Sequence, residues 1–143
     1  MTLTYRTATP DDIAAMTIIR NSVTENRLSD PSRVSQADYL DSLARLGQSW
    51  VCEANGAITG FSSADKVDGS IWALFIDRAH EGKGSGQALL ALAVDYLFAH
   101  GHERVVLSTG ADTRADRFYA AQGWLRSPIA ASTNVSYTLP RPA

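Results

Sequence analysis

The N-terminal third of the chain combines one strand-like pattern with two helical ones. Residues 3–7 predict a short strand. The segment 9–12, Thr-Pro-Asp-Asp, is typical of a helix start, because the threonine can cap the first turn and proline is favoured at its first position. The apolar stripe of this helix consists of Ile13, Met16, Ile19 and Val23. After a loop over 26–33, a second capping box at 35–38 predicts a helix that ends at Gly47 and buries Tyr39, Leu40, Leu43 and Leu46.

The pattern then changes to that of β-strands. Segments 50–52 and 57–61 flank Asn55-Gly56, a pair that is favoured in two-residue hairpin turns. A second turn, Asp68-Gly69, leads into the apolar segment 71–76. These segments predict an antiparallel meander of three strands.

Residues 81–86, Glu-Gly-Lys-Gly-Ser-Gly, form the most informative turn of the chain. They lie between the strand 71–76 and a helix that is apolar at Leu89, Leu90, Ala93, Val94, Leu97 and Phe98. A turn with few side chains at a helix start leaves several backbone N–H groups available to an anion such as phosphate. The glycine spacing matches neither the P-loop nor the dinucleotide-binding fingerprint. If the glycines alone are considered, the alternative to an anion site is a tight strand-to-helix connection that binds no ligand.

The last third of the chain predicts strand, helix, strand and strand. Segment 104–108 is apolar and is expected to lie parallel to strand 71–76, because crossover connections are right-handed. A capped helix follows over 113–123, and two short strands, 124–125 and 135–139, complete the pattern.

Composition indicates an ordinary globular domain. The chain has 143 residues, 45% hydrophobic and 20% charged, with a formal net charge of −2, and we expect one domain over 1–143. Lys and Arg are spread along the sequence and no apolar run reaches the length of a membrane span, so we expect neither nucleic-acid nor membrane binding. The single Cys52 excludes an internal disulfide, and His100 and His102 read as surface residues. We therefore expect no metal and a cytoplasmic location.

Three segments carry a distinctive combination of motifs. They are 73–77 (Ala-Leu-Phe-Ile-Asp), 80–90 with its Gly-Lys-Gly-Ser-Gly core, and 117–124, which contains Phe118-Tyr119 and Gly123-Trp124. This combination resembles the GNAT superfamily of acyl-CoA-dependent N-acetyltransferases, whose signature is Arg/Gln-x-x-Gly-x-Gly/Ala followed by an aromatic–Tyr pair and Gly-Phe/Trp. The resemblance covers essentially the whole chain. It implies an α/β fold with a mixed, splayed sheet in the order β-α-α-β-β-β-α-β-α-β-β.

The resemblance also implies that acetyl-CoA binds as a cosubstrate. The implied cofactor-binding residues are Leu74, Phe75, Ile76, Gly82, Lys83, Gly84, Ser85, Gly86, Gln87, Thr109, Arg114 and Phe118. Glu81 departs from the family pattern, which has Arg or Gln there, and we expect its carboxylate to point to solvent because it would repel phosphates. Thr109 stands where many relatives have Asn. Arg114 either reaches the 3′-phosphate of the cofactor or stays solvated.

The implied activity is transfer of acetyl to a primary amine by direct attack through a tetrahedral intermediate. Tyr119 matches the position of the family's general acid, although periodicity alone would make it a core aromatic. The N–H of Phe75 or Ile76 would polarise the thioester carbonyl. Glu25 is the preferred general base, and the alternatives are Asp77, Glu53 and His80.

The acceptor is expected to be a small-molecule or peptide amine. The family builds its acceptor pocket at segment 20–33, where both signs of charge would also suit an amine that carries a carboxylate. Trp72 either lines this pocket or packs in the core. A homodimer is expected by analogy with the family. Two alternatives stay open: a CoA-binding sensor or structural subunit with little catalysis, and a domain that uses the glycine turn for another phosphate ligand.

Overall fold

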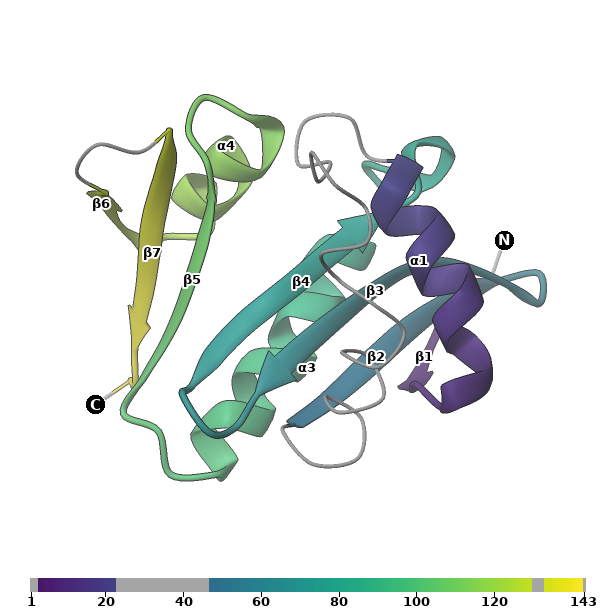
Figure 1. The fold of residues 1–143 in the computed structure, drawn as a ribbon, viewed down its shortest axis with the longest axis horizontal. Helices are drawn as coiled ribbons and strands as arrows, with labels where there is room; N and C mark the ends of the chain where they lie inside the picture. The colour runs from purple at the N-terminus through teal and green to yellow at the C-terminus, as the bar shows by residue number, and fades with distance from the viewer. Residues whose placement is uncertain (1–2, 23–46, 130–132, 143) are drawn as a thin grey trace.

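The computed structural model describes residues 3–22, 47–129 and 133–142, which form a mixed α/β structure (Figure 1). Its strands are β1 (Leu3–Thr7), β2 (Gly47–Ala54), β3 (Ala57–Asp65), β4 (Ser70–Ile76), β5 (Arg104–Gly110), β6 (Leu125–Pro128) and β7 (Asn134–Pro140). The helices within these residues are α1 (Ile13–Ser22), α3 (Ser85–Ala99) and α4 (Arg114–Ala121). Short 3-10 turns at Pro10–Asp12 and Arg78–His80 precede α1 and α3. In the described part of the chain, no helix has the length and apolarity needed to cross a membrane.

All these strands lie in one sheet in the order β1-β2-β3-β4-β5-β7-β6. The β4–β5 pair is parallel and the other neighbouring pairs are antiparallel, which confirms the predicted mixed sheet. The predicted hairpin turn is confirmed too, since Asn55 and Gly56 both have positive φ, 53° and 79°.

Some predicted boundaries are wrong. The strands β2, β3 and β5 extend beyond the apolar segments that predicted them, because sheet hydrogen bonding continues through polar residues. Trp124 was expected in a strand but precedes β6, since its N–H donates to the Tyr119 carbonyl at 3.3 Å and so completes the C-terminal cap of α4. The predicted helix before Gly47, the loop over 26–33 and Val23 lie outside the described residues, and Gly47 itself begins β2.

The predicted start of α1 is confirmed, although its first turn is a 3-10 turn. The Asp12 carboxylate accepts the Thr9 N–H at 2.8 Å, and this bond satisfies a backbone donor that the helix leaves unpaired. The same carboxylate accepts bonds from the two terminal nitrogens of Arg6 at 2.8 and 2.9 Å. The bonds from Arg6, more than the bond from Thr9, hold the pKa of Asp12 below its ordinary value. Strand β1 is thereby tied to the helix that follows it.

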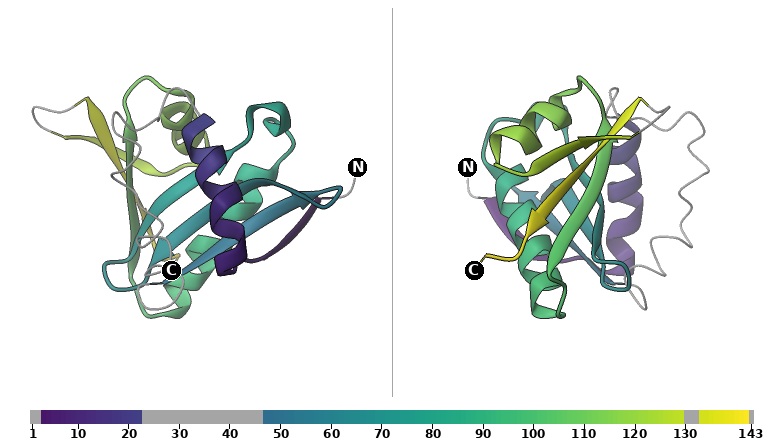
Figure 2. Two further views of the ribbon diagram at one scale, coloured as in Figure 1. Left: turned by 45° about the vertical axis from the view of Figure 1, so that its right-hand side comes forward. Right: turned by 90° about the vertical axis from the view of Figure 1, so that its left-hand side faces the viewer.

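Helix α1 packs on one face of the sheet, and α3 and α4 pack on the other (Figures 1 and 2). The predicted stripe of Ile13, Met16 and Ile19 is buried against Phe61 and Phe75. On the opposite face, the apolar side of α3 is buried together with Tyr119, Trp124, Tyr137 and other side chains. Strand β4 contributes to both cores, so its two faces are both covered.

Strand β4 contains an irregularity that opens the sheet. Ser63 of β3 pairs with Ala73 while Ala64 pairs with Ile71, so Trp72 is an extra residue and forms a β-bulge. A bulge bends and twists its strand. The register of β4 with β5 contains the single pair Ser70–Val106, and the strands diverge beyond it (Figure 1). The carboxyl end of β4 therefore presents a backbone edge that β5 does not cover.

Candidate functional site

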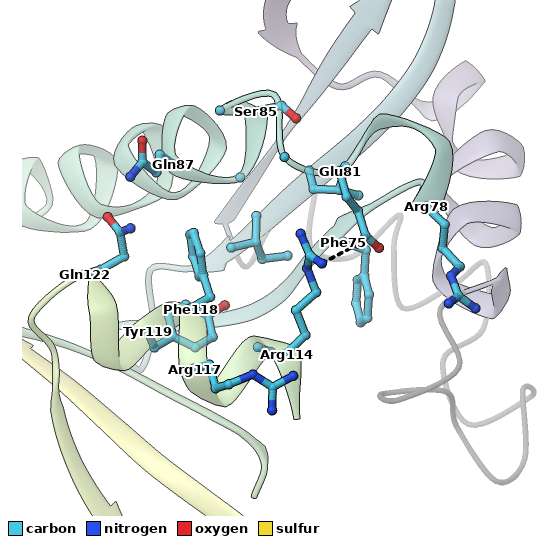
Figure 3. Close-up of a pocket in the computed structure, with 16 residues that line it drawn as sticks. Phe75, Arg78, Glu81, Ser85, Gln87, Arg114, Arg117, Phe118, Tyr119 and Gln122 are labelled. Atoms are coloured by element: carbon cyan, nitrogen blue, oxygen red, sulfur yellow. Dashed lines mark ion pairs between the residues drawn. The ribbon is translucent and has the colours of Figure 1, made fainter. Parts of the chain in front are cut away.

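A cavity of about 550 Å³ lies between the carboxyl end of β4, the start of α3, and α4 (Figure 3). The predicted cofactor-binding residues that line it are Leu74, Phe75, Ile76, Gly82, Gly84, Ser85, Gly86, Gln87, Arg114 and Phe118. We call it the first cavity. It brings β4 and the turn and helix start that follow it together with α4, which lies further along the sequence.

The glycine turn forms one wall of the first cavity. Gly82 and Gly84 have φ of 78° and 85°, the left-handed region that favours glycine, and Gly84 is the N-cap of α3. The first α-helical bond runs from the Ala88 N–H to the Gly84 carbonyl at 3.2 Å. The N–H groups of the preceding residues have no acceptor within the helix and lie at the positive end of its dipole. This wall therefore suits an anion.

The first cavity is rich in positive charge. Arg78, Arg114 and Arg117 all line it, and Arg114 and Arg117 come from α4 (Figure 3). Lys83 is exposed at the tip of the turn and is not part of the cavity wall. A cavity with several cations and a helix N-terminus matches the charge of a ligand with several phosphate groups.

Glu81 is placed differently from the expectation. Its side chain is 26% exposed, lines the first cavity and forms an ion pair with Arg114, with 3.2 Å between Oε2 and Nη1. The expectation that it points to solvent is wrong, because a cation on the facing helix holds it in the wall. Arg114 belongs to the cavity as predicted, although its own side chain is 61% exposed.

Tyr119 is a buried residue of the first cavity's wall. It is 5% exposed, and its ring contacts those of Phe118, Trp124 and Tyr137 at centroid distances of 5.2, 5.8 and 5.5 Å. Burial raises the pKa of its phenol above the ordinary value of 10.0. The phenol therefore stays protonated at neutral pH, as a proton donor must.

A second cavity of about 500 Å³ opens on the other side of the diverging strands. Its wall shares Leu74, Phe75, Ala115 and Tyr119 with the first cavity. Thr109, predicted to bind the cofactor, lines this second cavity and not the first. Trp72 lines it too, so the bulge places this side chain in a pocket wall.

The candidate bases that the structure describes are not gathered at these cavities. Glu53 is ion-paired with Arg6 on β1, and Asp77 lies 3.5 Å from the Nδ1 of His80. None of Glu53, Asp77 and His80 is part of either cavity wall. Glu25 lies outside the described residues.

Several lining residues were not expected from the sequence. Arg78, Arg117 and Gln122 line the first cavity, and Asn134 lines the second. Arg20, which also lines the second cavity, begins the segment 20–33 where the family resemblance placed the acceptor pocket. Asn134 begins β7 and pairs with Gly110, so β7 brings an amide to the end of β5 where the sequence shows none. The helical spacing of Arg114, Arg117 and Phe118 places them on neighbouring positions of α4 and could have indicated Arg117. No sequence pattern indicated Asn134, which reaches the site through strand pairing.

Residues 14–124, more than half of the chain, match the model of the Acetyltransferase (GNAT) family. The chain belongs to the GNAT acetyltransferase family. None of the curated proteins matches this GNAT protein in sequence.

Solved GNAT structures share its fold. The yncA protein of Salmonella typhimurium, solved with its cofactor acetyl-CoA, is 22% identical with a TM-score of 0.72, over 100% of this chain and 96% of that chain. The PaiA N-acetyltransferase of Thermoplasma acidophilum, solved with coenzyme A, is 13% identical with a TM-score of 0.82, over 98% and 99%. The ribosomal-protein-S18-alanine N-acetyltransferase of Escherichia coli is 17% identical with a TM-score of 0.76, over 99% and 96%. These likenesses confirm the GNAT fold that the sequence motifs predicted.

Proposed function

We propose that this protein transfers acetyl from acetyl-CoA to a primary amine of a small molecule or peptide. The observation that carries the proposal is the meeting of the two cavities at Leu74, Phe75 and Tyr119. A donor in the first cavity and an acceptor in the second would approach each other at the opening between β4 and β5. Such positioning of two reactants is a large part of enzymatic rate enhancement.

The first cavity fits acetyl-CoA in charge and in backbone geometry. The N-terminus of α3 and three arginines offer positive charge to the phosphates. The edge of β4 that β5 leaves uncovered can pair with the amides of the pantetheine arm. Lys83, on the tip of the turn, adds positive charge just outside the wall.

Tyr119 is our proposed general acid. A neutral amine attacks the thioester carbon, the C–N bond forms, and collapse of the tetrahedral intermediate breaks the C–S bond. The phenol gives its proton to the departing thiolate, and the proton released from nitrogen restores the phenol through solvent. A phenol carries its proton at neutral pH, and burial raises the pKa of Tyr119 further above its ordinary value. We retain Glu25 as the proposed base and an amide of β4, at Phe75 or Ile76, as the proposed oxyanion donor.

The experiment compares wild type with Tyr119→Phe. Acetyl-CoA and free CoA should both raise the melting temperature of wild type, because each binds the folded state. Thiol release with a panel of amines, followed by mass spectrometry of the products, should show acetylation. Tyr119→Phe should lower kcat about tenfold or more while the Kd of acetyl-CoA stays nearly unchanged.

Tyr96→Phe is the matched control, because Tyr96 lies on α3 against Trp50 and lines neither cavity. Unaltered turnover in Tyr119→Phe would remove this residue from the mechanism. Binding of acetyl-CoA without turnover of any amine would favour a CoA-binding sensor or structural subunit. Absence of any stabilisation by acetyl-CoA would favour another phosphate ligand.

A further inference from the structure

Arg20 is a side chain that the proposed reaction does not yet use. It lies in the last turn of α1 and lines the second cavity. Its guanidinium stacks over Phe75 at 4.9 Å and lies 5.9 Å from the centre of the Trp72 ring. Both aromatic residues line the same cavity, and Phe75 is shared with the first cavity. Arg20 is therefore part of the wall close to the point where the two cavities meet.

Two nitrogens of the Arg20 guanidinium have no hydrogen-bond acceptor among the described residues. Its Nε and Nη1 are buried and have no hydrogen-bond partner within the described part of the chain. A guanidinium carries five N–H donors and stays charged at all accessible pH values. Leaving buried donors unpaired is unfavourable, and it is more so for a charged group. This side chain thus has binding capacity that the described residues do not satisfy.

The second cavity has the charge of an anion site. Among the described residues that line it, Arg20 carries the one formal charge. The facing wall is polar but neutral, with Ser108, Thr109 and Asn134 at the ends of β5 and β7. A carboxylate that entered this cavity would meet a cation on one side and neutral polar groups on the other.

Two structural explanations for Arg20 are incomplete. A cation in the last turn of a helix interacts favourably with the helix dipole, but an exposed side chain would gain the same benefit. Stacking on aromatic rings stabilises a guanidinium through its face, yet the N–H donors lie in the plane of the group and still need acceptors. Both explanations leave the buried Nε and Nη1 unpaired.

We propose that Arg20 binds a carboxylate of the acceptor, so that the preferred substrates are small amines that also carry a carboxylate. This inference rests on the proposed acetyltransferase function and names its substrate class. The planar guanidinium can bind a carboxylate through two parallel hydrogen bonds, which would also orient the amine toward the opening beside Tyr119.

The test uses matched pairs of acceptors: glycine and glycinamide, and β-alanine and β-alaninamide. The two members of each pair have nearly the same size and shape, and the amide lacks the negative charge of the acid. In wild type, kcat/KM should be about tenfold or more higher for the acid than for its amide. Arg20→Gln should lower kcat/KM for the acids about tenfold more than for the amides, chiefly through KM. Arg20→Lys should rescue part of the loss, because lysine keeps the charge but not the bidentate geometry.

Arg104→Gln is the matched control, since Arg104 is exposed at the start of β5 and lines neither cavity. Binding of the same compounds to the enzyme–CoA complex, followed by ligand-observed NMR, gives a readout that does not depend on turnover. Weaker binding of the acids in Arg20→Gln supports the inference. Equal use of acids and amides by wild type, equal losses in Arg20→Gln, or no binding of acids to the complex would overturn it. Efficient acetylation of uncharged or polycationic amines would overturn this inference alone and leave the acetyltransferase function standing.

Discussion

At the scale of single residues, Glu81 has two opposing effects on the first cavity. Its carboxylate adds negative charge to a wall that would hold phosphates. The same carboxylate pairs with Arg114 across the cavity, and so holds one arginine of α4 near the glycine turn (Figure 3). The pair is partly exposed, and such pairs contribute little to stability. We therefore expect the repulsion of phosphate to outweigh the benefit of the pair.

Glu81→Gln should strengthen the binding of acetyl-CoA. Two unit charges about 4 Å apart in water interact with a free energy of about 1 kcal/mol. Removing this repulsion between Glu81 and a phosphate should therefore lower the Kd of acetyl-CoA about three- to tenfold. The effect should shrink as ionic strength rises, because salt screens exposed charges. Isothermal titration calorimetry at low and high salt measures both quantities. Arg114→Gln is the opposing variant and should weaken binding, and weaker binding in Glu81→Gln would show that positioning of Arg114 dominates.

At the scale of elements, the turn between β4 and α3 depends on backbone conformation at particular glycines. Gly84 has a φ of 85° and ends the turn as the N-cap of α3, whereas Gly86 lies inside the helix. A Cβ at Gly86 would meet the Phe118 ring at 3.7 Å, an ordinary contact distance. The two glycines therefore differ in how a methyl group would be accommodated.

Gly84→Ala should lower the free energy of unfolding by about 1 kcal/mol, because alanine is strained at positive φ. Gly86→Ala should leave it unchanged or raise it, because alanine favours the helix and has room there. Chemical denaturation of wild type and the two variants measures their free energies of unfolding, and so compares two glycines of the same turn. Equal losses of stability in both variants would show that the conformation at Gly84 is not what this turn requires.

The elements also show what could be predicted from the sequence. The capped start of α1, the Asn55-Gly56 hairpin and the glycine turn were predictable because local backbone chemistry decides them. The role of Trp72 was not, because a bulge breaks the alternation along β4 and depends on pairing with β3. Asn134 reaches the second cavity through strand pairing, whereas Arg20 was indicated only by the family resemblance, which placed the acceptor pocket at segment 20–33. Contacts between distant segments of this kind leave no mark in a local pattern.

At the scale of the whole molecule, one polar cluster holds the C-terminal part of the sheet to α4. The Asp116 carboxylate accepts bonds from Arg126 Nε and Nη2 at 2.9 and 3.0 Å and from the Asp112 N–H at 2.8 Å. The hydroxyl of Tyr137 also contacts this carboxylate, and it lies 2.8 Å from the Asp116 carbonyl oxygen. The cluster joins α4, β6 and β7 on the far side of the opening. The position of Tyr119 relative to β4 depends on this joined unit, because Tyr119 lies on α4.

The cluster should make stability depend on pH in the acid range. The bonds from Arg126, Tyr137 and the Asp112 N–H hold the pKa of Asp116 well below its ordinary value of 3.8. A carboxyl group whose folded-state pKa is lowered stabilises the protein above its unfolded pKa, and this stability is lost as pH falls below about 4. Melting temperature should therefore drop more steeply with acidification in wild type than in Asp116→Asn, which should already melt lower at pH 7. Asp95→Asn, at an exposed position of α3, is the control and should follow wild type. If melting temperature fell equally with pH in wild type and Asp116→Asn, other carboxylates would cause the acid sensitivity. The Asp12–Arg6 pair would then be the next to test.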